Sequence, residues 1–240
     1  MGAAAGHRIG RRLIGQFFRT GRVTDVRPVA ARMSRITLAV PELPWSPGQQ
    51  VRVCVGNIAA PASWLDGLRR TYSVWDYDGA LLQLCVLDHG DGPGARWARS
   101  VQAGDEVLFS PPEGAMVLRP AAHHLFAGEE TAAVAFGPML RALGAVPYRA
   151  VLEVDGPASR LPLGDEVSWR YRGGAPAASS ASLVAAVREL DLPAEPGSAY
   201  LAGEARTIQA IAQHLVRERG WPRRAIRAKP FWTPGKTGLD

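Results

Sequence analysis

Several residue types and patterns that mark common protein classes are scarce in this sequence. Cysteine occurs twice among 240 residues, at Cys54 and Cys85, which excludes a metal centre with four cysteine ligands. Both cysteines lie in apolar, strand-like runs, so we expect buried free thiols, although a single disulfide bond is also compatible. No apolar run approaches the ~20 residues of a membrane-spanning helix, so we expect no stable membrane insertion.

Lysine is also rare: the chain has only Lys229 and Lys236, compared with 26 arginines, and its net charge is +6. A basic balance attracts nucleic acid, an anionic cofactor or an anionic metal chelate. No basic run is interleaved with aromatics as in single-strand binders, so nucleic acid is not an expected partner. The five histidines show no metal-ligand spacing, and no nucleophile motif is present, so we expect no bound metal.

The first half of the chain has the pattern of short strands separated by proline and glycine. Alternating segments occur at 22–29, 35–40, 50–55, 69–75, 80–87 and 106–110. Residues 1–19 are expected to be flexible, and 56–68 to form a loop. The N-terminus lacks the apolar core of a secretory signal, and we expect a cytoplasmic protein. This half, 20–117, is predicted to be an antiparallel barrel or sandwich.

The second half, 118–240, alternates strands with helices, which predicts parallel strands joined by crossover helices. Strands are expected at 124–127, 149–154, 167–171 and 199–202, and helices at 131–143, 183–190 and around 208–215. Pro138 is expected to kink or split the first of these helices. The fold class is therefore all-β followed by an open parallel α/β half.

The segment Arg69–Trp75 carries the most informative side chains. On a strand, Arg70 and Tyr72 share one face, while Thr71 and Ser73 share the other. A guanidinium suits a phosphate, a phenol suits stacking on a flat ring, and a hydroxyl suits a ring nitrogen. This combination suggests a flavin nucleotide; the alternative is a surface strand with solvated charges.

Three glycine-containing turns are further candidates for nucleotide contacts. The turn from His89 to Ala98 precedes a short helical pattern and suits a phosphate, or it is a plain loop. Gly128–Thr131 and Gly203–Ala205 each follow a strand and precede a helix, where open α/β sheets bind ligands. The alternative is that both are ordinary strand-to-helix turns without a ligand, and that Thr131 is a helix cap.

The C-terminal tail, Lys229–Lys236, contains Phe231 and Trp232 between the two lysines. These aromatic side chains are expected to pack on the core or to cover a cofactor. Lys236 is a candidate contact for an anionic substrate.

Together these stretches resemble the ferredoxin-reductase-like flavoproteins and, within them, the siderophore-interacting proteins. The resemblance runs from about residue 20 to the end. It rests on the R-x-Y-S segment, His89-Gly90 with Gly92-Pro93 and Trp97-Ala98, Gly128–Ala132, Trp169, Ala202–Ala205 and Phe231-Trp232.

The resemblance implies a Greek-key FAD-binding barrel, an NAD(P)H-binding α/β half and a cytoplasmic ferric-siderophore reductase. Arg70 would bind the FAD phosphate, Tyr72 would pack on the isoalloxazine, and Ser73 would lie near its N5 atom. Lys236 would face the substrate, a ferric siderophore or other anionic ferric chelate. The remaining implied FAD or NADPH/NADH contacts are Thr71, His89, Gly90, Gly92, Pro93, Gly94, Ala95, Trp97, Gly128, Glu130, Thr131, Gly203, Glu204, Ala205 and Trp232.

Trp75 departs from the resemblance, because the family often has a basic residue there. No catalytic acid or base is expected, since the flavin would carry the chemistry. A monomer is expected. Two other functions stay open: a flavin reductase serving another acceptor, and a siderophore-binding accessory protein without turnover.

Overall fold

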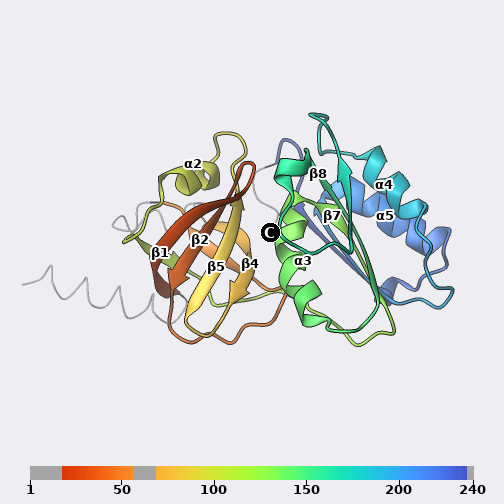
Figure 1. Ribbon diagram of the computed structural model, residues 1–240, viewed down its shortest axis with the longest axis horizontal. Coiled ribbons are helices and arrows are strands. Elements are labelled where there is room, and N and C mark those ends of the chain that lie inside the picture. The colour runs from red at the N-terminus through yellow and green to blue at the C-terminus, as the bar shows by residue number, and fades with distance from the viewer. Residues whose placement is uncertain (1–17, 57–68, 237–240) are drawn as a thin grey trace, which may run out of the picture.

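The computed structural model describes residues 18–56 and 69–236, which form a β-barrel followed by an α/β half (Figure 1). The flexible segment expected at 1–19 and the loop expected at 56–68 fall almost entirely outside these residues. Among the described residues, no helix is long and apolar enough to cross a membrane. Nor do three or more histidine, cysteine or acidic side chains gather there in a metal-binding group.

The barrel is closed and antiparallel, with the strand order β1-β2-β5-β4-β3-β6, so the predicted fold of this half is confirmed. Valine and leucine side chains from alternate strand positions fill its interior. The short helix α2 (Pro93–Ser100) packs against it through Ala98. The strands are β1 (Arg19–Ala30), β2 (Met33–Ala39), β3 (Gln50–Cys54), β4 (Arg69–Tyr77), β5 (Leu81–Leu87) and β6 (Glu106–Phe109).

The second half is a parallel sheet of order β11-β10-β7-β8-β9, which confirms the predicted α/β architecture. Helix α3 lies between this sheet and the barrel, whereas α4 and α5 cover the opposite face (Figure 1). Its elements are β7 (His124–Glu129), α3 (Glu130–Ala142), β8 (Tyr148–Val154), the 3-10 turn η2 (Pro157–Ser159), β9 (Val167–Tyr171), α4 (Ala181–Arg188), β10 (Ser198–Glu204), α5 (Ala205–Arg217), the 3-10 turn η3 (Arg223–Ala225) and β11 (Ile226–Trp232).

Two local expectations need correction. Pro138 does not split the predicted helix, because α3 continues through it from Glu130 to Ala142. The C-terminal segment is not an irregular tail but contains β11, the edge strand that pairs in parallel with β10, and Phe231 packs against the core as expected. An edge strand tolerates Pro230, which cannot donate a ladder hydrogen bond, and this proline obscured the strand pattern.

The two halves share one hydrophobic core. Barrel residues Met33, Trp75 and Cys85 pack in the same buried cluster as Phe136 and Met139 of α3. Cys85 and Cys54 are both buried free thiols, as expected. Because the cluster is continuous across the junction, separating the halves would expose apolar surface at a cost of ~25 cal/mol per Å².

Trp75 is the centre of this junction. Its indole lies against Gly137 so closely that a Cβ atom at Gly137 would overlap the ring. The Arg141 guanidinium lies 4.8 Å from the centre of the Trp75 ring and also donates to the Trp75 carbonyl. The residue that departs from the family resemblance is therefore a packing wedge between β4 and α3, and Gly137 provides the notch that receives it.

We predict that Gly137→Ala lowers the free energy of unfolding by ~1–3 kcal/mol, the usual cost of overpacking a core. Helix propensity alone would raise it by ~1 kcal/mol, so the two effects have opposite signs. Urea denaturation of Gly137→Ala, Trp75→Leu and the double variant measures the coupling between the two positions. The double variant should lose less than the sum of the singles; a Gly137→Ala protein as stable as the parent would contradict the wedge.

Candidate functional site

Arg70, Tyr72 and Gly94 converge on one side of the barrel. Arg70 and Tyr72 project together from β4, as predicted from their spacing, and α2 brings Gly94 against both. A Cβ atom added to Gly94 would lie 2.7 Å from the Tyr72 hydroxyl and 3.4 Å from Cγ of Arg70. Glycine at this position therefore lets the α2 backbone approach a guanidinium and a phenol, a combination that fits a phosphate joined to a flat ring.

Tyr72 also stacks on Trp97 of α2, with ring centroids 5.6 Å apart and an interplanar angle of 28°. Burial raises the pKa of Tyr72 well above its ordinary value, although the nearby Arg70 charge acts in the opposite direction. The phenol is therefore neutral at physiological pH. Tyr72 and Trp97 together form an aromatic platform beside the phosphate-compatible group.

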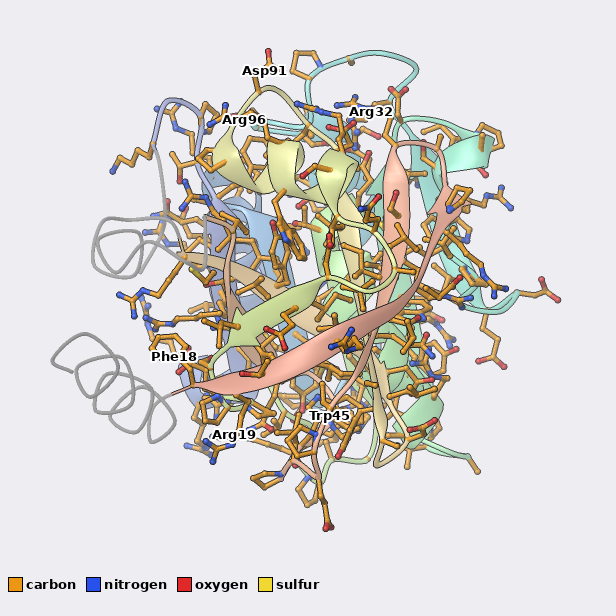
Figure 2. The ribbon with its side chains drawn as sticks, turned by 90° about the vertical axis from the view of Figure 1, so that its left-hand side faces the viewer. Phe18, Arg19, Arg32, Trp45, Asp91 and Arg96 are labelled. Atoms are coloured by element: carbon orange, nitrogen blue, oxygen red, sulfur yellow. The ribbon has the colours of Figure 1, made fainter. Side chains whose placement is uncertain are left out.

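The turn between β5 and α2 is fixed by charged side chains. Arg99 pairs with Asp88 and, at 3.3 Å, with Asp91. Asp91 and Arg96 lie at the same end of the barrel as Arg32 in the β1–β2 turn (Figure 2). Arg32 donates to the Asp88 carbonyl at 3.0 Å, which ties the two turns together.

The remaining predicted residues of this turn occupy distinct positions. Gly90 adopts a left-handed conformation with φ of 62°, and Gly92 is the N-cap residue of α2. Pro93 and Ala95 form the first turn of the helix, whereas His89 is exposed. The turn thus presents backbone amides near Arg70, and His89 stands at its edge.

The second group of predicted residues lies at the carboxyl ends of β7 and β10, which are neighbours in the sheet. A Cβ atom at Gly128 would overlap Ala132 and the Ala202 carbonyl. Gly203 has φ of +118°, a conformation that other residues rarely adopt. The sequence therefore places glycines where β7, β10 and α3 come closest, at the point where strand order reverses and open sheets bind ligands.

Glu129 joins three elements at this position. Its carboxylate accepts from the Thr131 amide at 3.0 Å, from the Thr131 hydroxyl, and from the Trp232 indole of β11 at 3.1 Å. Glu129, not Thr131, is the N-cap residue of α3, so the cap interpretation of Thr131 is wrong. Burial raises the pKa of Glu129 to about 7, and the neighbouring Glu130 charge adds to this effect.

Other glutamates at this edge have partners of their own. Arg172 pairs with Glu130 through the two terminal nitrogens of its guanidinium. Fully buried Glu153 accepts from the Ser180 hydroxyl at 2.6 Å. Glu204 caps α5, which begins at Ala205, by accepting from the amides of Arg206 and Thr207. The first turns of α3 and α5 are thus neutralised by the chain itself.

A polar cluster between the two halves was not predicted. It consists of Gln50, Arg52, Glu113 and Lys229. Arg52 pairs with Glu113 at 2.6 Å, and the Lys229 ammonium donates to the Gln50 side chain. Gln50 is the register partner of Ser73 across β3 and β4, which places this interdomain polar cluster beside the candidate strand. The alternation of 50–55 could have indicated that Gln50 and Arg52 share a face.

Two predicted residues lie apart from these groups. Lys236 is exposed beyond β11, and its side chain makes no hydrogen bond or ion pair within the described chain. Lys229, from the same segment, is the lysine that reaches the barrel. Thr71 is exposed on the outer face of β4. The structure thus forms two groups from the predicted residues, one around Arg70 on the barrel and one at the carboxyl ends of β7 and β10, and Lys236 belongs to neither.

An open groove of about 400 Å³ lies between α4 and α5, lined by residues that include Ser180, Arg188 and Arg206. These helices cover the sheet face opposite α3 (Figure 1). The groove therefore does not contain the Arg70–Tyr72 group, and we assign the site from side-chain chemistry and not from cavity size.

Glu129 should lower stability as pH rises from about 4.5 to about 7, whereas His123 and His124, whose pKa values burial lowers, act in the opposite direction. Across this window the folded state keeps the proton of Glu129 while the unfolded chain releases it, so deprotonation favours unfolding. The contribution is on the order of 1–3 kcal/mol, at 1.36 kcal/mol per pKa unit. Urea denaturation at several pH values should show that the free energy of unfolding falls less steeply with pH for Glu129→Gln than for the parent. Part of the fall should remain, because burial also raises the pKa of Glu153. An unchanged slope would contradict the assignment.

Comparison with known proteins agrees with this geometry. Residues 47–116 match the model of the siderophore-interacting FAD-binding domain, and residues 121–235 match that of the siderophore-interacting protein. A ferric vibriobactin reductase, ViuB, from Vibrio cholerae is 30% identical over 178 residues, covering 70% of this chain and 65% of the relative. The chain thus spans slightly less than two thirds of that relative.

Solved structures extend the likeness to nearly the whole chain. A siderophore utilization protein from T. fusca has a TM-score of 0.80 and 26% identity, covering 93% of this chain and 95% of the other. The siderophore-interacting protein SipS from Aeromonas hydrophila has a TM-score of 0.79 and 25% identity, with coverage of 92% and 93%. Both family models fall on consecutive halves of one fold, and the chain belongs to the siderophore-interacting protein family.

Proposed function

We propose that this protein is an FAD-dependent reductase that passes electrons from NAD(P)H to a ferric siderophore. The observation that carries the proposal is the convergence of Arg70, Tyr72 and Gly94 on one side of the barrel. The match of residues 47–116 to an FAD-binding domain supports it. The ferric reductase activity named for the Vibrio cholerae relative supports the acceptor.

In this proposal the barrel holds FAD. Arg70 and the α2 turn from Gly90 to Ala95 bind the pyrophosphate, and the Tyr72–Trp97 platform contacts the ring system. Ser73 and its backbone lie on the opposite face of β4, toward Gln50. The flavin, when bound, would accept two electrons as hydride and pass them on one at a time to Fe(III).

The proposed nucleotide seat is the carboxyl edge of β7 and β10. Gly128 and Gly203 let β7, β10 and α3 approach one another closely, and Trp232 is held over this edge by Glu129. Glu129 and Glu204 already cap the N-termini of α3 and α5, so these helix ends are not available to the pyrophosphate of the donor. The pyrophosphate would have to bind to positively charged side chains instead. Exposed arginines near the edge are the available source of positive charge.

Arg160 favours NADPH over NADH as the donor. Arg160 follows the turn η2, which comes after β8. Its guanidinium lies 5.0 Å from the ring centre of Tyr171 and 5.9 Å from that of Trp169, both on β9. The carboxylate of Asp155 accepts from the Gly174 amide, and Glu153 is buried. An exposed arginine suits a 2′-phosphate, whereas a ribose diol is usually bound by an available carboxylate.

The acceptor in the proposal is a ferric chelate, treated as a substrate and not as a resident metal. Ferrous iron is held less tightly than ferric iron by hard oxygen ligands, so reduction would release it. Since the donor is a pyridine nucleotide, we place the reaction in the cytoplasm. The chain's own residues hold and orient the reactants, and none acts as an acid or base.

The purified protein should carry FAD absorbance that NADPH bleaches without oxygen, and a ferric chelate should restore the absorbance. Bleaching by NADPH should exceed that by NADH at equal concentration, because Arg160 is exposed and has no carboxylate partner in the described chain. Anaerobic stopped-flow spectroscopy measures both steps. Bleaching without recovery by ferric chelates would point to another acceptor; a protein that never binds FAD would overturn the proposal.

Arg70→Ala should reduce FAD retention at least tenfold, the range expected for losing a charged hydrogen bond of about 1.5–3 kcal/mol. Arg69→Ala is the matched control, since it removes the same charge from the adjacent position on the other face of β4. Flavin content after gel filtration and the dissociation constant of FAD measure the difference. Equal losses in both variants would show that Arg70 acts only through net charge.

A further inference from the structure

The interdomain polar cluster has the position expected of an acceptor site. Gln50 and Arg52 project from β3 on the face that carries Ser73 of β4, and Lys229 reaches them from β11. Glu113 follows the barrel strands and is bound to Gln50 by two backbone hydrogen bonds of 2.8 and 2.9 Å. If the flavin lies along Tyr72 and Ser73, this cluster faces its reactive edge from both halves of the protein.

The charges of the cluster are partly cancelled from within. Arg52 and Glu113 form an ion pair of 2.6 Å, with 35% and 40% of their side chains exposed. Lys229 is half-buried, and burial lowers its pKa, while Glu113 raises it and Arg52 lowers it. Two cations and one carboxylate leave a net charge of at most about +1 for an incoming chelate.

A carboxylate at the rim of an otherwise cationic site discriminates by repulsion. A chelate with three negative charges gains from Arg52 and Lys229 but is repelled by Glu113 at similar distance. A neutral chelate loses nothing, because it neither attracts nor repels the carboxylate. The net basic charge of the chain still attracts anions from a distance, so the selection occurs at contact and not during approach.

We propose that Glu113 weakens the binding of trianionic tris-catecholate chelates relative to neutral tris-hydroxamate chelates, by cancelling the charge of Arg52. This inference rests on the proposed function for the meaning of the site. It also predicts a property of the cluster that can be measured without electron transfer, since Ga(III) forms chelates of the same charge as Fe(III) but is not reduced by flavins.

The experiment measures binding of gallium desferrioxamine E, which is neutral, and gallium enterobactin, which is trianionic, to the FAD-loaded protein by calorimetry. Glu113→Gln should strengthen binding of the trianionic complex about tenfold and change that of the neutral complex less than twofold. Comparing one pair of ligands across variants cancels differences in their shape.

Glu113→Asp is the matched control, because it keeps the charge while shortening the side chain, and it should bind both complexes as the parent does. Arg52→Gln should weaken binding of the trianionic complex. A Glu113→Gln protein with an unchanged affinity for the trianionic complex would overturn the proposal, as would one whose two affinities change together. Failure of NADPH to bleach the flavin would instead refute the reductase function, and is measured separately.

Discussion

The packing of Trp75 into the notch at Gly137 is the contact on which the rest of the structure depends. It joins β4, which carries Arg70 to Ser73, directly to α3, whose first turn adjoins Gly128 and Glu129. A single hydrophobic core across the junction holds the two groups in fixed relation. A donor bound at the strand ends and a flavin bound on the barrel would therefore meet without a large movement of either half.

Buried glutamates determine the chemistry of the strand ends. Glu129 and Glu204 cap α3 and α5, and Glu130 is paired with Arg172. Capping stabilises the helix starts but uses the partial positive charge that would otherwise attract a phosphate. An anionic ligand at this edge would therefore need positive side chains such as Arg160. The charge of Arg52 is likewise cancelled within the protein, by its ion pair with Glu113.

The sequence predicts the elements well where periodicity is strong, and the barrel, the parallel sheet and the shared face of Arg70 and Tyr72 were all accessible. It fails where tertiary contacts override local rules. Pro138 sits inside an intact helix because α3 is packed on both sides, and Pro230 hides an edge strand. Linear order also does not show that the edge strand carries Lys229 to the barrel. The packing role of Trp75 depends on α3, which is distant in sequence and lies beside it only in the folded chain.

We propose that the flavin lies along β4, with its pyrophosphate at Arg70 and Gly94 and its ring along Tyr72 and Ser73. A crystal structure of the protein with bound FAD tests this most directly. We expect pyrophosphate density within hydrogen-bond distance of Arg70 and the α2 amides, and the ring's N5 edge facing Ser73 and Gln50. Flavin density elsewhere, such as in the groove between α4 and α5, would contradict it.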